Sequence, residues 1–419
     1  MLFCQKHVSL LKYCVSYAKL VSWLHFGIRC YPDIMTGEGI KEVISRLSNM
    51  SHCDCVHLSV NSFQKPTPYV SSSSEEGAIC FTPAPKFYEG SRIKPNKAKQ
   101  FGNLDVLEEV CREAKKKGIE VYAVLNCLVN QPVLRRKPEY AQVGSGGEKS
   151  DRLFPFMCFN NPSVERYILS LTSDILSNYD VAGIELEKLH YSVTSPFKTG
   201  NLTCFCEYCR AEARNQGINL EGVKRRLIFF PKPFGEPQRI MEASSSNPFS
   251  VSLKVLRSWA SLLGLSSWLQ HRRHMVSEIN GRVMIASRQA NADAAVGIDL
   301  CPSEISWIAG HDYRSLGKNL DCLYPLIEES LIHHGDSSVA NELRSVRRTL
   351  RGVMREVKVY PLAIFGPSIS AKETVNLVKS ASEESNGLVL HAYGQISVEN
   401  LKAFGQTAKK VLAENPHDR

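Results

Sequence analysis

Several features that mark common classes of protein are missing from this sequence of 419 residues. It has no run of about 18 consecutive apolar residues, which excludes a membrane-spanning helix. None of its early apolar runs is followed by a glycine-rich turn, so a dinucleotide-binding fold is disfavoured. Only four tryptophans occur, and this does not favour a long binding cleft lined with aromatic rings.

Concentrated positive charge is missing too, although the formal net charge is +9 at pH 7. The lysines and arginines form short, scattered groups, such as those at 115–117, 135–137 and 224–226. Nucleic-acid-binding proteins usually gather these residues into one patch or stripe. The sequence therefore predicts neither a nucleic-acid partner nor a membrane partner.

Cysteine is the residue type that is unusually frequent, with 14 copies. Most of them stand singly inside apolar stretches, as Cys30, Cys111 and Cys322 do, and there a buried reduced thiol is the usual state. This usage suits a reducing compartment and predicts a cytoplasmic protein. Residues 1–20 contain no compact apolar core followed by a cleavage site, so we expect an N-terminal extension, either a leader or part of the fold.

The rest of the chain repeats one pattern, in which a short apolar run rich in β-formers precedes an amphipathic stretch. Strands are predicted at 24–31, 55–61, 120–126, 181–187, 282–287, 321–327, 357–365 and 387–393. Eight such units predict the α/β class and a (β/α)₈ TIM barrel over 21–415; an open doubly wound sheet is the alternative.

The longest gap between predicted strands, 192–280, is expected to be a large helical insertion between strands four and five. A loop rich in Pro and Ser within it would cover the barrel mouth or contact a second chain, so a homo-oligomer remains open.

Active sites of such barrels lie at the carboxyl ends of the strands. Polar and aromatic residues at the predicted ends are therefore candidates for binding a substrate: Arg29, Tyr31, Asn61, Asn126, His190, Tyr191, Arg288, Tyr324, His391 and Tyr393.

Two carboxylates on the fourth predicted strand stand out. Glu185 and Glu187 are two residues apart, so they point to the same side of a strand. Carboxylates in an apolar strand are costly to bury unless they are solvated, paired or used. Both are candidate catalytic groups; the alternative is that one of them forms a structural ion pair with Arg29 or Arg288.

A second group of residues has metal-ligand spacing. Cys204, Cys206 and Cys209 follow a C-x-C-x-x-C pattern in a predicted loop, and Cys158 is a candidate fourth ligand. Four thiolates would form a closed, structural zinc site and not a catalytic one. Cysteines that bind no metal are the alternative.

These residues carry a resemblance. Cys158-Phe-Asn-Asn-Pro162, the strand that ends Gly-Ile-Glu-Leu-Glu187 and the loop Cys204-Phe-Cys-Glu-Tyr-Cys-Arg210 are similar to segments of the zinc-containing β-galactosidases of glycoside hydrolase family 42. They also resemble uncharacterised hydrolase-like barrels whose fourth strand reads Asp-Gly-Ile and then an acidic residue. The resemblance implies that the four cysteines hold zinc and that Glu187 is the acid/base.

The sequence departs from the family 42 pattern in two places. Leu186 stands where those enzymes have an Asn, and the predicted seventh strand continues to 368 without the carboxylate that serves as their nucleophile. A second carboxylate, which glycosidases need, would come from elsewhere. Asp299, expected in the loop after the fifth strand, is the first choice and Glu328 the second; the remaining candidates are Glu185 and Asp293.

The sequence therefore predicts a glycoside hydrolase that acts on a carbohydrate by carboxylate general acid/base catalysis. The alternative is a non-catalytic carbohydrate-binding or scaffold barrel that lacks the strand-seven nucleophile. A metal-dependent hydrolase would need histidine ligands at strand ends, and His57 is the lone candidate for that role.

Overall fold

The computed structural model describes residues 24–63, 75–149, 156–192, 202–228, 264–303 and 306–414. The predicted extension at 1–20 lies outside these residues, as does the part of the predicted insertion at 229–263. Of the insertion, the structure describes two helices before that gap, Glu207–Asn215 and Leu220–Ile228, and after it the first part of one helix, Ser266–Ala290.

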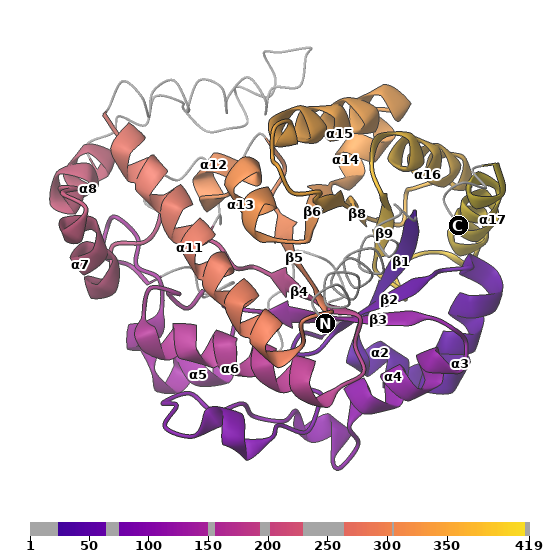
Figure 1. The fold of residues 1–419 in the computed structure, drawn as a ribbon, viewed down its shortest axis with the longest axis horizontal. Coiled ribbons are helices and arrows are strands. Elements are labelled where there is room, and N and C mark those ends of the chain that lie inside the picture. The colour runs from indigo at the N-terminus through magenta and orange to yellow at the C-terminus, as the bar shows by residue number, and fades with distance from the viewer. Residues whose placement is uncertain are drawn as a thin grey trace, which may run out of the picture.

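Parallel strands form a closed barrel, and helices surround it (Figure 1). Neighbouring strands pair in the order β5-β4-β3-β2-β1-β9-β8-β6, and β6 pairs with β5 to close the ring. The TIM barrel predicted from the alternating pattern is therefore confirmed. The strands are β1 (His25–Cys30), β2 (Cys55–Ser59), β3 (Glu120–Asn126), β4 (Gly183–Glu187), β5 (Ala295–Leu300), β6 (Cys322–Ile327), β7 (Lys358–Val359), β8 (Leu362–Ile364) and β9 (Gly387–His391).

Most helices pack their apolar face on the barrel, while α7 and α8 lie at its periphery beside α11 (Figure 1). The helices are α2 (Pro32–Glu38), α3 (Ile40–Arg46), α4 (Val106–Lys115), α5 (Gln131–Arg136), α6 (Pro162–Asn178), α7 (Glu207–Asn215), α8 (Leu220–Ile228), α11 (Ser266–Ala290), α12 (Ser306–Ala309), α13 (Tyr313–Asn319), α14 (Glu329–His333), α15 (Asp336–Leu350), α16 (Ala371–Glu384) and α17 (Val398–Glu414).

The prediction of a fifth strand at 282–287 is wrong. These residues belong to the 25-residue helix α11. A strand would place Val283 and Ile285 on one face, but Val283 is fully buried and Ile285 is 60% exposed. The fifth strand is β5, a few residues later, so Asp299 lies on a strand and not in a loop.

The seventh strand position is divided between β7 and β8, both of which pair with β6. The register from Leu323–Val359 to Leu326–Leu362 places Pro325 opposite Pro361 in the gap. Proline has no backbone N–H to donate, so the ladder between these strands is interrupted where the two prolines meet.

Large polar and aromatic side chains fill the inside of the barrel, and glycines make room for them. A Cβ on Gly27 would lie 2.9 Å from the His57 ring, and one on Gly297 would lie 2.4 Å from the Tyr324 ring. The His57 ring stacks on Tyr122 at 4.9 Å and meets Tyr324 edge-on at 5.6 Å. These contacts fix the layer on which the residues at the mouth rest.

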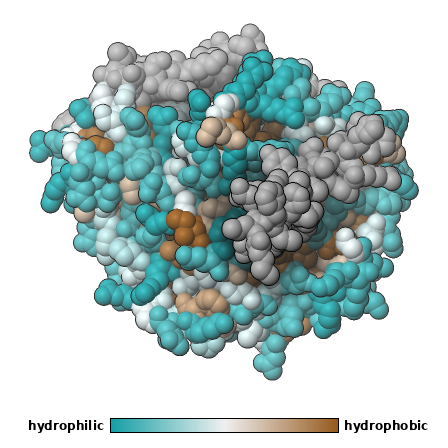
Figure 2. All heavy atoms as spheres, in the orientation of Figure 1, coloured by the Kyte–Doolittle hydropathy of each residue, from teal (hydrophilic) through white to brown (hydrophobic). Residues whose placement is uncertain are grey.

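The outer surface in view is mostly hydrophilic, with small, separate hydrophobic patches (Figure 2). Within the described ranges, no helix has both the length and the apolar character that crossing a bilayer requires.

Candidate active site and cysteine cluster

Glu187 and Asp299 lie at the carboxyl ends of adjacent strands. Leu186 on β4 pairs with Ile298 on β5, so the next residue of each strand, Glu187 and Asp299, continues the same register. Both side chains are slightly exposed, at 14% and 15%. The structure thus brings two of the three predicted catalytic carboxylates together at the mouth.

Arg29 joins the mouth to the barrel interior. Its guanidinium donates to both carboxylate oxygens of Asp299, at 3.0 and 3.1 Å, and also pairs with Glu185. Glu185 is fully buried and accepts a second bond, 2.5 Å long, from Nδ1 of His57. The ion pair with Arg29 that was the alternative interpretation of Glu185 is therefore present.

Burial and neighbouring charges shift the pKa values of Asp299 and Lys188 at the mouth. Burial raises the pKa of Asp299 to about 6; Glu187 adds to this rise and Arg29 opposes it. The Lys188 ammonium lies 2.6 Å from Glu187. Burial alone would lower the pKa of Lys188, but the charges of Glu187 and Glu76 outweigh it and raise the pKa. Lys188 is therefore a permanent cation beside Glu187.

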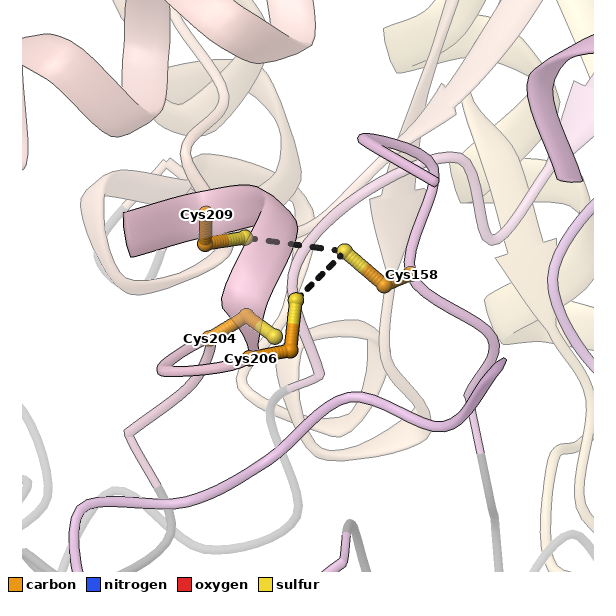
Figure 3. A group of neighbouring side chains, drawn as sticks. All are labelled: Cys158, Cys204, Cys206 and Cys209. Atoms are coloured by element: carbon orange, nitrogen blue, oxygen red, sulfur yellow. Dashed lines mark hydrogen bonds between the residues drawn. The ribbon is translucent and has the colours of Figure 1, made fainter. Parts of the chain in front are cut away.

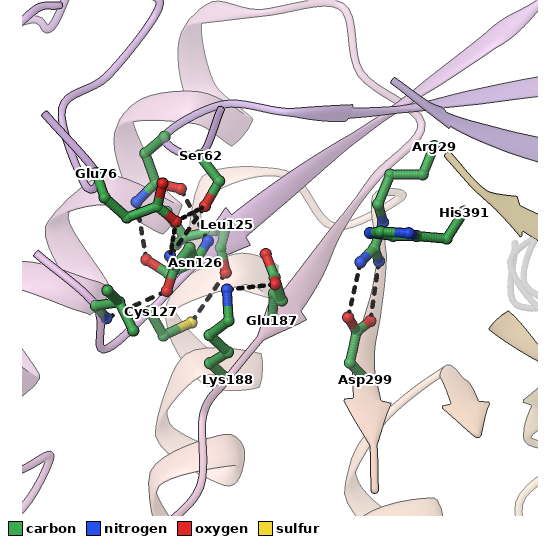
Figure 4. A network of polar contacts seen from close by, with 12 residues as sticks. Arg29, Ser62, Glu76, Leu125, Asn126, Cys127, Glu187, Lys188, Asp299 and His391 are labelled. Atoms are coloured by element: carbon green, nitrogen blue, oxygen red, sulfur yellow. Dashed lines mark hydrogen bonds and ion pairs between the residues drawn. The ribbon is translucent and has the colours of Figure 1, made fainter. Parts of the chain in front are cut away.

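On the side of Glu187 away from Arg29 and Asp299 lies a buried polar network (Figure 4). Asn126 pairs in register with Glu187, and its side-chain amide donates to Ser62 at 2.9 Å and to Glu76 at 3.2 Å. Asn61 exchanges two 2.8 Å hydrogen bonds with the backbone of Asn126. Asn61 and Asn126 are 1% and 2% exposed, so they are buried and hold the carboxyl ends of β2 and β3 together.

Tyr31 and His391 lie on the Arg29 side of the mouth. The Tyr31 hydroxyl and Nε2 of His391 are 2.9 Å apart. Burial, aided by the nearby Arg29, lowers the pKa of His391 to about 3. The imidazole is therefore neutral near pH 7, and its Nδ1 has no hydrogen-bond partner among the described residues.

Four residues that were predicted to bind a substrate at the strand ends have side chains that make their contacts away from the mouth. Arg288 is on α11 and pairs with Asp321, next to the amino end of β6. Tyr324 lies inside the barrel on the His57 layer. The Tyr393 hydroxyl donates to Glu38, at the end of α2, at 2.9 Å. Tyr191 is described below with the cysteines.

His190 is close to the mouth but turned inward. Its Nδ1 lies 2.8 Å from the backbone oxygen of Tyr191, and its ring contacts that of His311 edge-on at 5.0 Å. Burial lowers the pKa of His190 to about 4, so this side chain is neutral near pH 7.

Two of the other candidate second carboxylates are not part of this network. Asp293 precedes β5, at the opposite end of the barrel from Glu187. Glu328 follows β6 as the N-cap of α14, and burial raises its pKa.

Sequence analysis missed Glu76 and Lys188. Glu76 follows a serine-rich loop that carries no periodic signal. Lys188 directly follows the strand, where a positive φ of 59° turns its side chain back toward Glu187; only its position beside a candidate catalytic residue could have indicated it.

The four predicted metal ligands meet in one buried cluster (Figure 3). Their sulfur atoms lie within 4.8 Å of one another, and Cys158 is 3.5 Å from both Cys206 and Cys209. Cys158 comes from the loop before α6, Cys209 from α7, and Cys204 and Cys206 from the loop between β4 and α7.

The contacts within the cluster favour a thiolate at Cys206, while they raise the pKa of Cys158 and Cys209. Hydrogen bonds from the three neighbouring thiols hold the pKa of Cys206 well below its ordinary value, and Cys206 is also the N-cap of α7, where the helix dipole favours negative charge. The backbone N–H of Val143 donates to the sulfur of Cys204 at 3.3 Å. The side-chain amide of Asn160 donates to Cys209 at 3.2 Å.

The donor set and its spacing fit a structural zinc ion. Tetrahedral zinc with Zn–S bonds of about 2.3 Å requires sulfur–sulfur distances of about 3.8 Å, close to the separations in this cluster. No other group of three or more His, Cys, Asp or Glu residues in the described part of the chain has its ligand atoms close enough to share an ion. His57 therefore has no partners for the metal-dependent hydrolase alternative.

Residues 72–187 match the family model described as "Hypothetical glycosyl hydrolase 6". This match begins in the loop after β2, includes α4, β3, α5, α6 and β4, and ends at Glu187. Comparison with solved structures finds a similar fold in proteins that match almost the whole length of this chain. The chain is a TIM barrel that is similar to glycoside hydrolases.

Three solved structures illustrate the likeness. The β-galactosidase from the psychrophilic Marinomonas ef1 has a TM-score of 0.57 and 12% identity, with 94% of this chain and 60% of that chain covered. The β-galactosidase from Rahnella sp. R3 gives 0.59, 10%, 95% and 57%. The PgaB glycoside hydrolase domain from Bordetella bronchiseptica gives 0.54, 14%, 93% and 98%.

Because these identities are low, the structural likeness establishes the TIM-barrel fold and nothing finer. The barrel spans 60% of the length of the Marinomonas enzyme. A comparison with curated proteins gave no match.

Proposed function

We propose that this barrel hydrolyses a glycosidic bond, with Glu187 as the general acid/base and Asp299 as the second carboxylate. The register of β4 and β5 is the observation that carries the proposal. Adjacent strands lie about 4.8 Å apart, and carboxyl groups of retaining glycosidases are about 5–5.5 Å apart. The pair is therefore suited to a retaining mechanism, in which Asp299 is the nucleophile.

The surroundings suit these roles. Arg29 holds both oxygens of Asp299 and so fixes the direction from which the carboxylate attacks. The Lys188 ammonium lies 2.6 Å from Glu187 and orients this carboxyl group, which in a retaining reaction gives its proton to the leaving group in the first half and accepts one from water in the second. Tyr31 and the neutral His391 are suited to hydrogen bonding with sugar hydroxyl groups.

We expect turnover of at least one member of a broad panel of aryl glycosides, with net retention of anomeric configuration by NMR. Asp299 must be ionised to attack, so kcat/KM should fall as the pH drops through about 6. This loss would not come from unfolding. The folded-state pKa of Asp299 is raised, so its protonation favours the folded state, and the stability it contributes is lost only as the pH rises.

Circular dichroism at each pH provides the control for that profile. A chain that stays folded and bound to neutral glycans but turns over no member of the panel would favour the non-catalytic carbohydrate-binding barrel. The absence of a carboxylate from 358–364, the divided seventh strand, is the feature that keeps this second function open.

We propose further that Cys158, Cys204, Cys206 and Cys209 hold one structural zinc ion. We expect about one zinc per purified chain, loss of that zinc in Cys206→Ser, and a lower melting temperature when a chelator removes it. Cys111→Ser is the matched control, because Cys111 is a buried cysteine on α4 outside the cluster. A wild type that is metal-free and fully folded would contradict the proposal.

A further inference from the structure

Arg272, on α11, is a buried cation without a hydrogen-bond partner among the residues that the structure describes. Its side chain is 1% exposed, and none of its three guanidinium nitrogens is bonded by any described residue. A guanidinium has five N–H donors, and an uncompensated buried charge is strongly destabilising. No carboxylate in the described ranges forms an ion pair with it, so another source of negative charge is required.

Two aromatic rings hold the guanidinium in place. Its central carbon lies 4.4 Å from the centre of the Tyr191 ring and 4.9 Å from that of Trp268. Rings attract a cation through their quadrupoles, but they carry no net charge. They fix the position of Arg272 without neutralising it.

Both rings belong to the shell around the cysteine cluster. The side-chain amide of Asn160 that donates to Cys209 also contacts the Tyr191 hydroxyl at 3.5 Å. Trp268 packs on Phe205, the residue between Cys204 and Cys206, with ring centres 5.5 Å apart. This arrangement also explains why Tyr191 does not face the barrel mouth.

The electrostatics agrees with this placement. Burial lowers the pKa of Arg272 to about 10, while Tyr191, Cys204 and Cys209 act in the opposite direction. Two of the three groups that stabilise its charge are therefore members of the cluster.

We propose that Arg272 is the counter-ion of a four-thiolate metal centre formed by Cys158, Cys204, Cys206 and Cys209. Four thiolates and one divalent ion leave two net negative charges in a buried place, and Arg272 offsets one of them. The inference rests on the proposed zinc site and adds to it the residue that makes its charge tolerable. It also predicts that Arg272 loses this compensation when the metal and the Cys206 thiolate are removed together.

Zinc affinity, measured on the full chain by competition with a chromophoric chelator, tests the first part. Arg272→Met should weaken zinc binding by about 10- to 100-fold, the usual effect of losing an outer-shell partner, and Arg272→Lys should recover part of the loss. Arg225→Met on α8 is the control, because Arg225 is exposed. Affinity of Arg272→Met within twofold of the wild type would overturn the proposal, as would a wild type that binds no zinc.

The sign of the stability change separates charge compensation from packing. In the zinc-loaded wild type, Arg272→Met should lower the melting temperature. In a Cys206→Ser background, which lacks the metal, the same substitution should leave it unchanged or raise it, because it removes an uncompensated charge. Equal losses in both backgrounds would mean that Arg272 acts by packing alone. Zinc bound by the wild type with equal losses would leave the zinc site standing and remove only the role of Arg272.

Discussion

Replacing Glu187 by Gln should reduce kcat on aryl glycosides by about 10²- to 10⁴-fold, the range that general acid/base catalysis contributes. Gln has the shape of Glu but cannot give or take the proton. Because the side chain is 14% exposed at the mouth, the melting temperature should change little. The loss therefore reports on chemistry and not on folding.

The leaving group provides a sharper readout for Glu187. A poor leaving group needs protonation more than a good one does, so the loss in kcat/KM, which reports on the step that releases the aryl group, should grow as the pKa of the aryl alcohol rises. Glu328→Gln is the control, since Glu328 lies at the end of β6 outside the Glu187 network. A uniform loss in kcat/KM across all leaving groups, or the same dependence on the leaving group in Glu328→Gln, would show that Glu187 is not the acid/base.

Replacing Arg29 by Met should lower the free energy of unfolding by about 3–5 kcal/mol, because Glu185 would be left as a buried charge without its cation. Arg29 and Glu185 are 2% and 0% exposed. The control is Arg344→Met, whose pair with Glu384 is 46% and 20% exposed and should contribute about 0–1 kcal/mol. Urea denaturation followed by circular dichroism measures both values.

A second substitution checks the cause of that loss. Arg29→Met combined with Glu185→Leu removes both charges, so it should recover much of the stability that the single change loses. No recovery would mean that Arg29 stabilises the barrel by packing and not through its charge.

The fold could be predicted from the sequence where the pattern of apolar residues indicated a single type of element. The apolar runs that became β3 and β4 are short and bounded by turns. The prediction of the fifth strand was wrong because Val283-Met-Ile-Ala286 resembles a strand when taken alone. Only the longer spacing of buried residues, at Val276, Ile279 and Val283, reveals the helix.

The candidate site could be predicted in part for a physical reason. Parallel strands share one carboxyl end, so Glu187 was placed by its strand, and the cysteines were placed by their spacing. Contacts between distant loops cannot be deduced in this way. The approach of Glu76 to the mouth and the packing of Arg272 beside the cysteines depend on loop conformations that no local pattern encodes.

The two-sided pairing of Arg29 has a consequence for efforts to evolve or engineer this protein. Replacing the buried Arg29, Glu185 and His57 together by well-packed apolar residues is the kind of change that often makes a protein more stable. Here it would also strip Asp299 of the guanidinium that orients it. Selection for heat resistance alone would therefore tend to remove the contact between Arg29 and Asp299. Selection for turnover would keep the buried charges, although they lower the stability of the barrel.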